Sequence, residues 1–353
     1  MTHDATPTAA PLRLILDGEA LAANWRWLRG QGGDAACGAA IKADGYGVGA
    51  KATASRLLDA GCRDFFVATW AEADALAPFG DGINLSVLHG VRSADIPAAL
   101  ASSARPVLAS PAMVVRWKQA APDRPCDVMV DTGMNRLGLT VEEACSGLLD
   151  GLAIETLMSH LACADMPQSP MNGLQLQRFR QLAHNVPARR YSLANSAGIC
   201  LGRDYAFGLT RPGLGLYGGI PSAAALGHIR PVVRIEAEIL QIRSISPGDS
   251  VGYGATFTAI SPTRIAILNL GYADGYMRGF AGSGTVRAGD TVFPLAGRVS
   301  MDLIAVDIGN AAIGEGDWLE IDYALAEAAN RSGLSQYELL TGLGTRYQRH
   351  WIG

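Results

Sequence analysis

The sequence lacks the features that mark secreted, membrane and metal-binding proteins. No apolar run in its 353 residues is long enough to span a membrane, and residues 1–11 lack the basic and apolar regions of a signal peptide. Its six cysteines are scattered without a CxxC pair, which fits reduced thiols better than a disulfide framework. Its six histidines show no HxH or HExxH spacing, so we expect no metal site. Together these absences predict a cytoplasmic protein.

Charge is also scarce. Asp, Glu, Lys and Arg make up 18% of the chain, and the formal net charge is -4. We therefore expect no nucleic-acid partner and no binding to an acidic membrane surface. Hydrophobic residues make up 49%, which indicates a well-buried globule. The chain is too long for one small core, so two domains, or a barrel with an appendage, are expected.

The first two thirds of the chain alternate short apolar runs with helix-compatible segments. The runs are continuously apolar, as in Phe65-Phe66-Val67-Ala68, which is typical of parallel strands covered on both faces. Eight βα units over about 200 residues predict a (β/α)8 TIM-type barrel, with an open doubly wound sheet as the main alternative. The predicted strands begin near Gly38, Asp64, Ile83, Arg105, Cys126, Ile154, Arg190 and Phe207.

The pattern changes after about Ile229. Residues 232–244 alternate apolar and polar side chains, and turn signals such as Ser246-Pro247-Gly248-Asp249 separate the strand-like runs that follow. The sequence therefore predicts a barrel at 12–229 and a mainly β domain at 230–353.

Lys42 ends the first predicted strand, and a loop with three glycines follows it at once. The lysine is thus placed beside backbone that can approach an anion closely. This suits an amine that forms an imine with a phosphate-bearing cofactor. The alternative is a solvated lysine after an edge strand. Tyr46, in the same loop, is either a core ring or a hydroxyl that reaches the phosphate.

Other polar residues follow later strands at their C-terminal ends, the face on which barrel enzymes place their sites. Asn195 and Ser196 resemble a helix start able to bind phosphate. The stretch 211–218 formally contains GxGxxG, but its late position and Pro221 disfavour a dinucleotide site. His160 is either a buried core histidine or a ring that stacks on a flat cofactor.

Four specific motifs follow one another along the chain: Ile41–Gly47, Asp131–Gly138, Gly271–Gly275 and Gly297–Asp302. In this order they resemble those of alanine racemase, a family of fold-type III pyridoxal-phosphate enzymes. The match runs from about Leu14 to Trp351. It implies a (β/α)8 barrel with a β domain, a pyridoxal 5'-phosphate cofactor and a homodimer with shared active sites. It also implies racemisation of L- and D-alanine, supplying D-alanine for peptidoglycan precursors.

The resemblance also assigns roles to single residues. Lys42 is similar to the lysine that binds the cofactor covalently, and Tyr253 to the second catalytic base, which acts in the partner subunit's site. Arg211 corresponds to an arginine facing the pyridine nitrogen. The other implied cofactor-binding residues are Tyr46, His160, Asn195, Ser196, Gly213 and Leu214. The implied substrate-binding residues are Arg136, Met301 (donated across the dimer) and Tyr272, with Asp302 near the entrance.

The chemistry of racemisation asks for such a set. A proton leaves one face of Cα and another returns to the opposite face, which one rigid base cannot serve efficiently. A tyrosine has an ordinary pKa of about 10, so Tyr253 needs positive charge nearby to act as a base near neutrality. Arg211 does not readily give up its proton and should leave the pyridine nitrogen unprotonated, which disfavours transamination.

Three positions depart from the family's pattern. Met129 stands where relatives often carry a carbamylated lysine that braces the substrate arginine. Arg136 then needs another partner, and our hypothesis is a bound anion such as chloride. Electron density showing neither an anion nor an acidic side chain beside Arg136 would reject it. Ser192 replaces an expected histidine, and Thr345 an expected phosphate-binding tyrosine. These departures concern rate, substrate range and cofactor affinity more than reaction type.

Three other functions remain open at this stage. A racemase of broader range would accept serine or larger amino acids, although Tyr272 and its loop should restrict large side chains. Fold-type III decarboxylases usually face the pyridine nitrogen with an acid, against which Arg211 argues. Non-catalytic pyridoxal-phosphate-binding proteins often consist of the barrel alone, and the β domain argues against that class.

Overall fold

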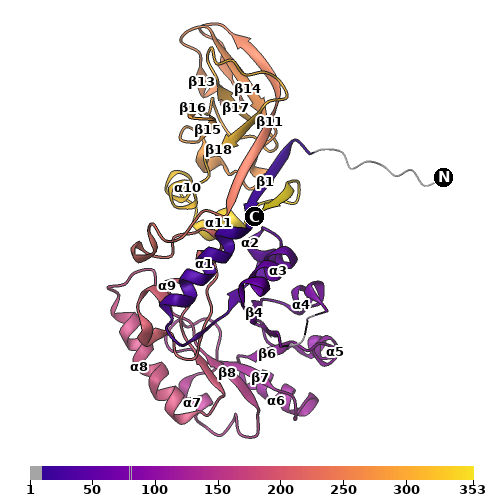
Figure 1. Cartoon of the computed structure of the whole chain (residues 1–353), viewed down its shortest axis with the longest axis vertical. Helices are drawn as coiled ribbons and strands as arrows, with labels where there is room; N and C mark the ends of the chain where they lie inside the picture. Colours follow the sequence, from indigo (N-terminus) through magenta and orange to yellow (C-terminus); the bar gives the residue numbers. More distant parts are fainter. Residues whose placement is uncertain (1–9, 79, 81) are drawn as a thin grey trace, which may run out of the picture. The chain divides into compact units, whose positions relative to one another are not determined.

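The computed structural model describes residues 10–78, 80 and 82–353, which form two compact units (Figure 1). The barrel unit is Ala20–Arg230, and the β unit combines the described residues up to Glu19 with Pro231–Gly353. This division differs from the predicted 12–229 and 230–353 at the start of the chain. Strand β1 (Leu12–Asp17) pairs with β11 (Val233–Ile245) and β19 (Gln348–Ile352), so it belongs to the β unit.

A closed ring of parallel strands forms the core of the barrel unit. Strands β3 to β9 pair in chain order, and β10 (Leu209–Thr210) pairs with β2 (Ala36–Cys37). The backbone N–H groups of Gly208 and Arg211 donate to carbonyls at and just after β9, at 3.0 and 2.9 Å, so β10 closes the ring. The predicted (β/α)8 barrel is confirmed. The remaining strands are β3 (Ala39–Ala40), β4 (Asp64–Val67), β5 (Asn84–Val87), β6 (Arg105–Leu108), β7 (Cys126–Met129), β8 (Ile154–Met158) and β9 (Arg190–Ser192).

Helices connect these strands, and several begin at side-chain caps. Thr69, Ser110 and Thr140 each accept a hydrogen bond from a backbone N–H of the first helical turn, which satisfies a donor that has no partner inside the helix. None of the helices formed by the described residues has the length and hydrophobicity needed to cross a membrane. The helices are α1 (Gly18–Gln31), α2 (Lys42–Tyr46), α3 (Ala50–Ala60), α4 (Trp70–Leu76), α5 (Ile96–Ala101), α6 (Pro111–Ala120), α7 (Val141–Ala144), α8 (Pro170–Asn185) and α9 (Ser196–Cys200).

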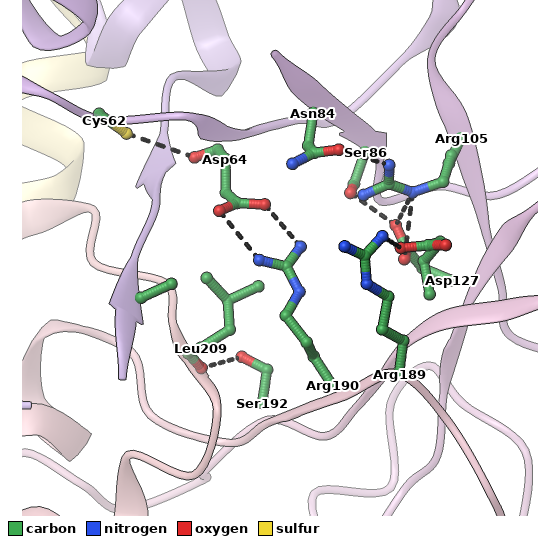
Figure 2. A network of polar contacts seen from close by, with 12 residues as sticks. Cys62, Asp64, Asn84, Ser86, Arg105, Asp127, Arg189, Arg190, Ser192 and Leu209 are labelled. Atoms are coloured by element: carbon green, nitrogen blue, oxygen red, sulfur yellow. Dashed lines mark hydrogen bonds and ion pairs between the residues drawn. The ribbon is translucent and has the colours of Figure 1, made fainter. Parts of the chain in front are cut away.

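Charged side chains are buried near the N-terminal ends of several barrel strands (Figure 2). Figure 2 shows the fork of Arg190 meeting the carboxylate of Asp64, at 2.6 and 3.0 Å. Asp127 accepts from Ser86 at 2.6 Å and pairs with Arg105 at 3.4 Å. Burial raises the pKa of Asp127, and Arg105 opposes that rise. This end of a barrel usually serves stability, which leaves the opposite end for chemistry.

The β unit is mainly β, as predicted. Strand β11 runs through its eight-stranded sheet and buries Ile235, Ala237 and Ile239 on one face, the period of two seen in the sequence. The other elements are β12 (Ser250–Val251), β13 (Phe257–Thr258), β14 (Thr263–Leu268), β15 (Thr285–Ala288), β16 (Thr291–Pro294), β17 (Ile304–Asp307), β18 (Trp318–Ile321), α10 (Leu325–Ser332) and α11 (Gln336–Thr341). Short 3-10 turns are η1 (Ser93–Asp95), η2 (Arg203–Tyr205), η3 (Leu214–Tyr217), η4 (Ala223–Ala225), η5 (Tyr253–Ala255), η6 (Tyr272–Asp274) and η7 (Arg278–Phe280).

Candidate active site

Lys42 opens a left-handed turn directly after β3. Lys42 is the first residue of α2, and the other four residues, 43–46, have φ values from 51° to 63°. A left-handed conformation costs a non-glycine residue about 1–2 kcal/mol, so this turn persists only because its surroundings hold it. One holding contact is the Ala43 N–H, which donates to Glu72 Oε1 at 2.8 Å. The turn thereby fixes the backbone from which the Lys42 amine extends.

The structure brings Lys42 together with predicted site residues that follow other strands. Burial lowers the pKa of Lys42, Arg136 and Arg211 lower it further, and Glu72 opposes them. Burial lowers the pKa of His160 to about 3, helped by Arg211, Arg136 and Lys42. His160 is therefore a neutral ring near pH 7, and Lys42, Arg136 and Arg211 lie close enough to influence its protonation.

Arg211 is buried and held on two sides. Its guanidinium donates to the Ser159 carbonyl at 2.6 Å and to the Ser192 hydroxyl, which in turn donates to the Leu209 carbonyl at 2.5 Å. Ser192, one of the departures from the family's pattern, thus supplies a hydrogen-bond acceptor to Arg211. Burial lowers the pKa of Arg211 to about 10, which leaves the guanidinium charged at neutral pH.

Small donors gather around Gly213. The Ser196 hydroxyl accepts from the N–H groups of Gly213 and Gly215 at 2.9 and 3.2 Å. A Cβ at position 213 would overlap the hydroxyl of Tyr46, and that ring stacks on Tyr217 with centroids 4.7 Å apart. Two hydroxyls and backbone N–H groups at one glycine fit a phosphate.

Two neighbouring residues shape this cradle. Asn195 caps α9, because its Oδ1 accepts from the Gly198 N–H at 2.8 Å. Leu214 is buried and begins η3, so the GxGxxG stretch forms a 3-10 turn and not the helix of a dinucleotide-binding motif.

Arg136 lies in a loop that Asp131 organises. The Asp131 carboxylate accepts backbone N–H bonds from Gly133, Met134 and Arg136 at 2.7 to 2.9 Å. The Arg136 side chain is exposed and forms no hydrogen bond or ion pair with the other described residues, while Met129 is buried. The guanidinium is free to receive an anionic group.

Gln175 is a site residue that sequence reasoning missed. It is fully buried on α8; its amide donates to the His160 carbonyl at 2.9 Å and to Thr132 at 3.2 Å, and accepts from the Ala162 N–H at 2.9 Å. It therefore ties the His160 segment to the loop that carries Arg136. The helical spacing could have indicated its burial, because Gln175 lies on the same face of the helix as the apolar Phe179.

The β unit gathers the remaining predicted residues. Tyr272 donates its N–H to the Ser300 carbonyl at 3.0 Å, and a Cβ at Gly271 would overlap the Met301 carbonyl. The side chains of Tyr253 and Met301 are 71% and 53% exposed, so they are available to a partner surface. The structure thus forms two sets of site residues, one in each unit.

Arg346 stabilises the loops that carry the predicted site residues of the β unit. Its guanidinium pairs with the fully buried Asp274 at 2.6 and 2.7 Å and with the exposed Asp302 at 2.6 Å. Asp274 also accepts the Gly271 N–H at 2.9 Å. The arginine therefore links η6, which carries Tyr272, to the loop that carries Met301.

Asp274→Asn is expected to lower the free energy of unfolding by about 2–3 kcal/mol, because it takes the buried one of the two charged partners from Arg346 and leaves a buried site half-satisfied. Asp302→Asn, which removes the exposed partner of the same arginine, should change it by less than about 1 kcal/mol. Urea denaturation of both variants measures the difference. Equal effects would show that the buried pair does not brace the loops.

Family models match both units of the chain. Residues 16–221 match the family described as alanine racemase, N-terminal domain, and residues 232–351 match alanine racemase, C-terminal domain. The chain belongs to the alanine racemase family. It is therefore an amino-acid racemase by family, and the sequence-based identification is confirmed.

Individual members of the alanine racemase family resemble it over nearly their whole length. An alanine racemase of Methylobacterium nodulans is 41% identical over 96% of this chain and 96% of that protein. A biosynthetic alanine racemase of Agrobacterium fabrum is 41% identical over 97% of this chain and 94% of that protein. The crystal structure of alanine racemase from Bartonella henselae, with covalently bound pyridoxal phosphate, superposes with a TM-score of 0.90 at 33% identity, covering 98% of this chain and 100% of that one.

Proposed function

We propose that this protein interconverts L- and D-alanine with pyridoxal 5'-phosphate as cofactor, acting as a homodimer and supplying D-alanine for peptidoglycan precursors. The observation that carries the proposal is the electrostatic coupling of Lys42 to a neutral His160 and a charged Arg211, together with Tyr46 of the same turn, which lies against Gly213. Membership of the alanine racemase family supplies the reaction type.

The residues present fit this cofactor. Lys42 would hold its aldehyde carbon, and the hydroxyls of Tyr46 and Ser196 with the backbone at Gly213 and Leu214 would hold its phosphate. Asn195 keeps α9 in place beside that phosphate. The neutral ring of His160 is suited to stack on the pyridine, and Arg211 to donate to its nitrogen. When bound, the cofactor supplies an electron sink that weakens the Cα–H bond of the amino acid.

The protein's own groups would then orient the substrate and move the protons. Arg136 has an exposed guanidinium without a protein acceptor, and it binds the substrate carboxylate. The lowered pKa of Lys42 favours the neutral amine, which can accept or donate a proton on one face of Cα. Tyr253 of the partner subunit serves the other face.

The exposed tyrosine supports a site shared between two subunits. Tyr253 and Met301 of the partner subunit line the substrate's side of the site, while Tyr272 limits side-chain size at the entrance. The guanidinium of Arg298 lies against Gly254, where a Cβ would be 3.4 Å from Cζ, and so places a positive charge beside the residue next to Tyr253.

The proposal is tested by the visible spectrum of the purified protein and by optical rotation and Cα deuterium exchange with L- and D-alanine. Parallel turnover with serine, lysine and arginine separates an alanine racemase from a racemase of broader range. Alanine should be the preferred substrate. Absence of exchange with both alanine enantiomers, or release of carbon dioxide, would overturn the assignment.

Gly213→Ala is expected to weaken cofactor binding at least tenfold, about 1.4 kcal/mol, because the added methyl group overlaps the Tyr46 hydroxyl and lies 2.9 Å from its Cζ. The stacked, buried Tyr46 has little room to withdraw. Titration of the cofactor-free protein with pyridoxal phosphate, followed by absorbance, measures the dissociation constant. Gly30→Ala, where a Cβ meets no atom within 4 Å, is the matched control and should bind like the parent.

A further inference from the structure

Glu72 occupies a capping box at the start of α4. Its Oε2 accepts the N–H groups of Ala68 and Thr69 at 2.6 and 3.2 Å, and the Thr69 hydroxyl accepts the Glu72 N–H at 3.2 Å. Such a reciprocal pair is a common way to begin a helix and engages only one carboxylate oxygen here.

The second carboxylate oxygen of Glu72 accepts a hydrogen bond from outside α4. Oε1 accepts the N–H of Ala43 at 2.8 Å, and Ala43 directly follows Lys42. Ala43 is also the first residue of the left-handed stretch 43–46, with φ 51° and ψ 49°. A non-glycine residue is held there against its own preference, so an outside hydrogen bond at this N–H stabilises the turn.

The charge of Glu72 also acts on the lysine amine. Among the charged groups that act on Lys42 in the described part of the chain, Arg136 and Arg211 are cations and Glu72 is the anion. His160 packs nearby but is neutral at pH 7. Asp44, in the same turn, directs Oδ1 to the Ala50 N–H of α3 at 2.8 Å.

We propose that Glu72 is a positioning residue for Lys42, which ties the left-handed turn to α4 through one oxygen and offsets the two arginines that face the amine. Its catalytic meaning rests on the function proposed above, in which Lys42 holds the cofactor and carries a proton. The link between the Glu72 carboxylate and the turn that begins at Lys42 can be tested without measuring turnover.

Two substitutions distinguish the hydrogen bond between Glu72 and Ala43 from the negative charge of Glu72. Glu72→Gln removes the negative charge and keeps one of the two acceptor oxygens, so the pKa of Lys42 falls further below its ordinary value. Glu72→Ala removes the hydrogen bond as well. Thr140 and Glu143 provide the control, because they form the same capping box on α7, at 2.9 and 3.1 Å.

The experiment uses the full chain, stripped of cofactor with hydroxylamine. Acetylation of Lys42 with acetic anhydride, followed across pH by peptide mapping, gives the midpoint of amine deprotonation. Hydrogen exchange of a peptide covering 42–47 reports the turn. We expect a lower midpoint in Glu72→Gln and faster exchange in Glu72→Ala, with Glu143→Gln and Glu143→Ala at parent values.

A midpoint in Glu72→Gln equal to that of the parent, or equal shifts in the Glu143 control, would overturn the charge role. Parent-like exchange in Glu72→Ala would overturn the anchoring role. If Glu72→Ala does not fold, exchange is measured in Glu72→Met, which keeps the side-chain length without an oxygen. Failure to racemise alanine, with the Lys42 midpoint still shifted, would count against the proposed function and leave the link intact.

Discussion

Lys42→Ala is expected to abolish the interconversion of L- and D-alanine in both directions, by at least about 1,000-fold. In the proposed mechanism, the substitution removes the amine that holds the cofactor and also the group that moves a proton on one face of Cα. The variant should fold, because it takes away a half-buried amine that faces two cations. Optical rotation started from each enantiomer, with thermal denaturation as a folding check, measures the outcome.

Lys51→Ala is the matched control for that result. Lys51 is exposed on α3, in the same part of the chain, and its removal should leave both directions at parent rates. Borohydride reduction of the native, loaded protein should fix the cofactor to position 42 and not to position 51. A label at Lys51 or at Lys118 would show that the covalent attachment has been assigned to the wrong amine.

The barrel could be predicted because its signals are local. Continuous apolar runs ending in polar residues placed most strand starts within one residue of those observed, as at Asp64, Arg105 and Ile154. The last strand begins at Leu209 and not at Phe207, since its two residues give little periodicity to read. The C-terminal ends of the strands then placed the candidate site residues on one face.

Features that depend on distant pairing could not be read in the same way. Strand β1 pairs with β19 through contacts such as Arg13 with Gln348, and no local pattern near Leu12 specifies that partner. The buried pair of Asp64 and Arg190 likewise joins two separate strands. Each residue alone looks like an ordinary charged side chain at a strand end.

The left-handed turn and its supports illustrate the same limit at the site. Three glycines near Lys42 predicted a loop that can approach an anion closely, but the left-handed conformation falls on Ala43, Asp44 and Tyr46 as well as on glycine. Propensity argues against it there, and a tertiary contact from Glu72 overrides propensity. Functional sites are where such conflicts between local preference and final structure are expected.

The departures from the family's pattern have different structural outcomes. Ser192 supplies an acceptor to Arg211, so the loss of the expected histidine leaves that arginine held. Met129 supplies nothing to Arg136, whose guanidinium forms no ion pair with the other described residues. The hypothesis of a bound anion beside Arg136 therefore stays a prediction, and anomalous diffraction from bromide-soaked crystals would test it. Thr345 is exposed, and nothing in the described part of the β unit shows what it replaces.

Tyr253→Phe is expected to reduce removal of the Cα proton from L-alanine by about 100- to 1,000-fold, because it deletes the hydroxyl that serves one face and leaves the ring in place. Proton removal from D-alanine depends on Lys42 and should fall less. Exchange of Cα hydrogen with deuterated water, measured separately for each enantiomer by NMR, resolves the two faces.

Tyr337→Phe provides the control for Tyr253→Phe. Tyr337 is another partly exposed tyrosine of the β unit, 45% exposed against 71% for Tyr253, and its hydroxyl should be dispensable for exchange. Parent-like exchange of L-alanine in Tyr253→Phe would rule out this hydroxyl as the second base. Equal loss for both enantiomers would point instead to a defect in substrate placement, since a base confined to one face cannot govern proton removal from the other. The asymmetry between enantiomers, more than the size of the loss, therefore decides whether Tyr253 and Lys42 divide the two faces of Cα between them.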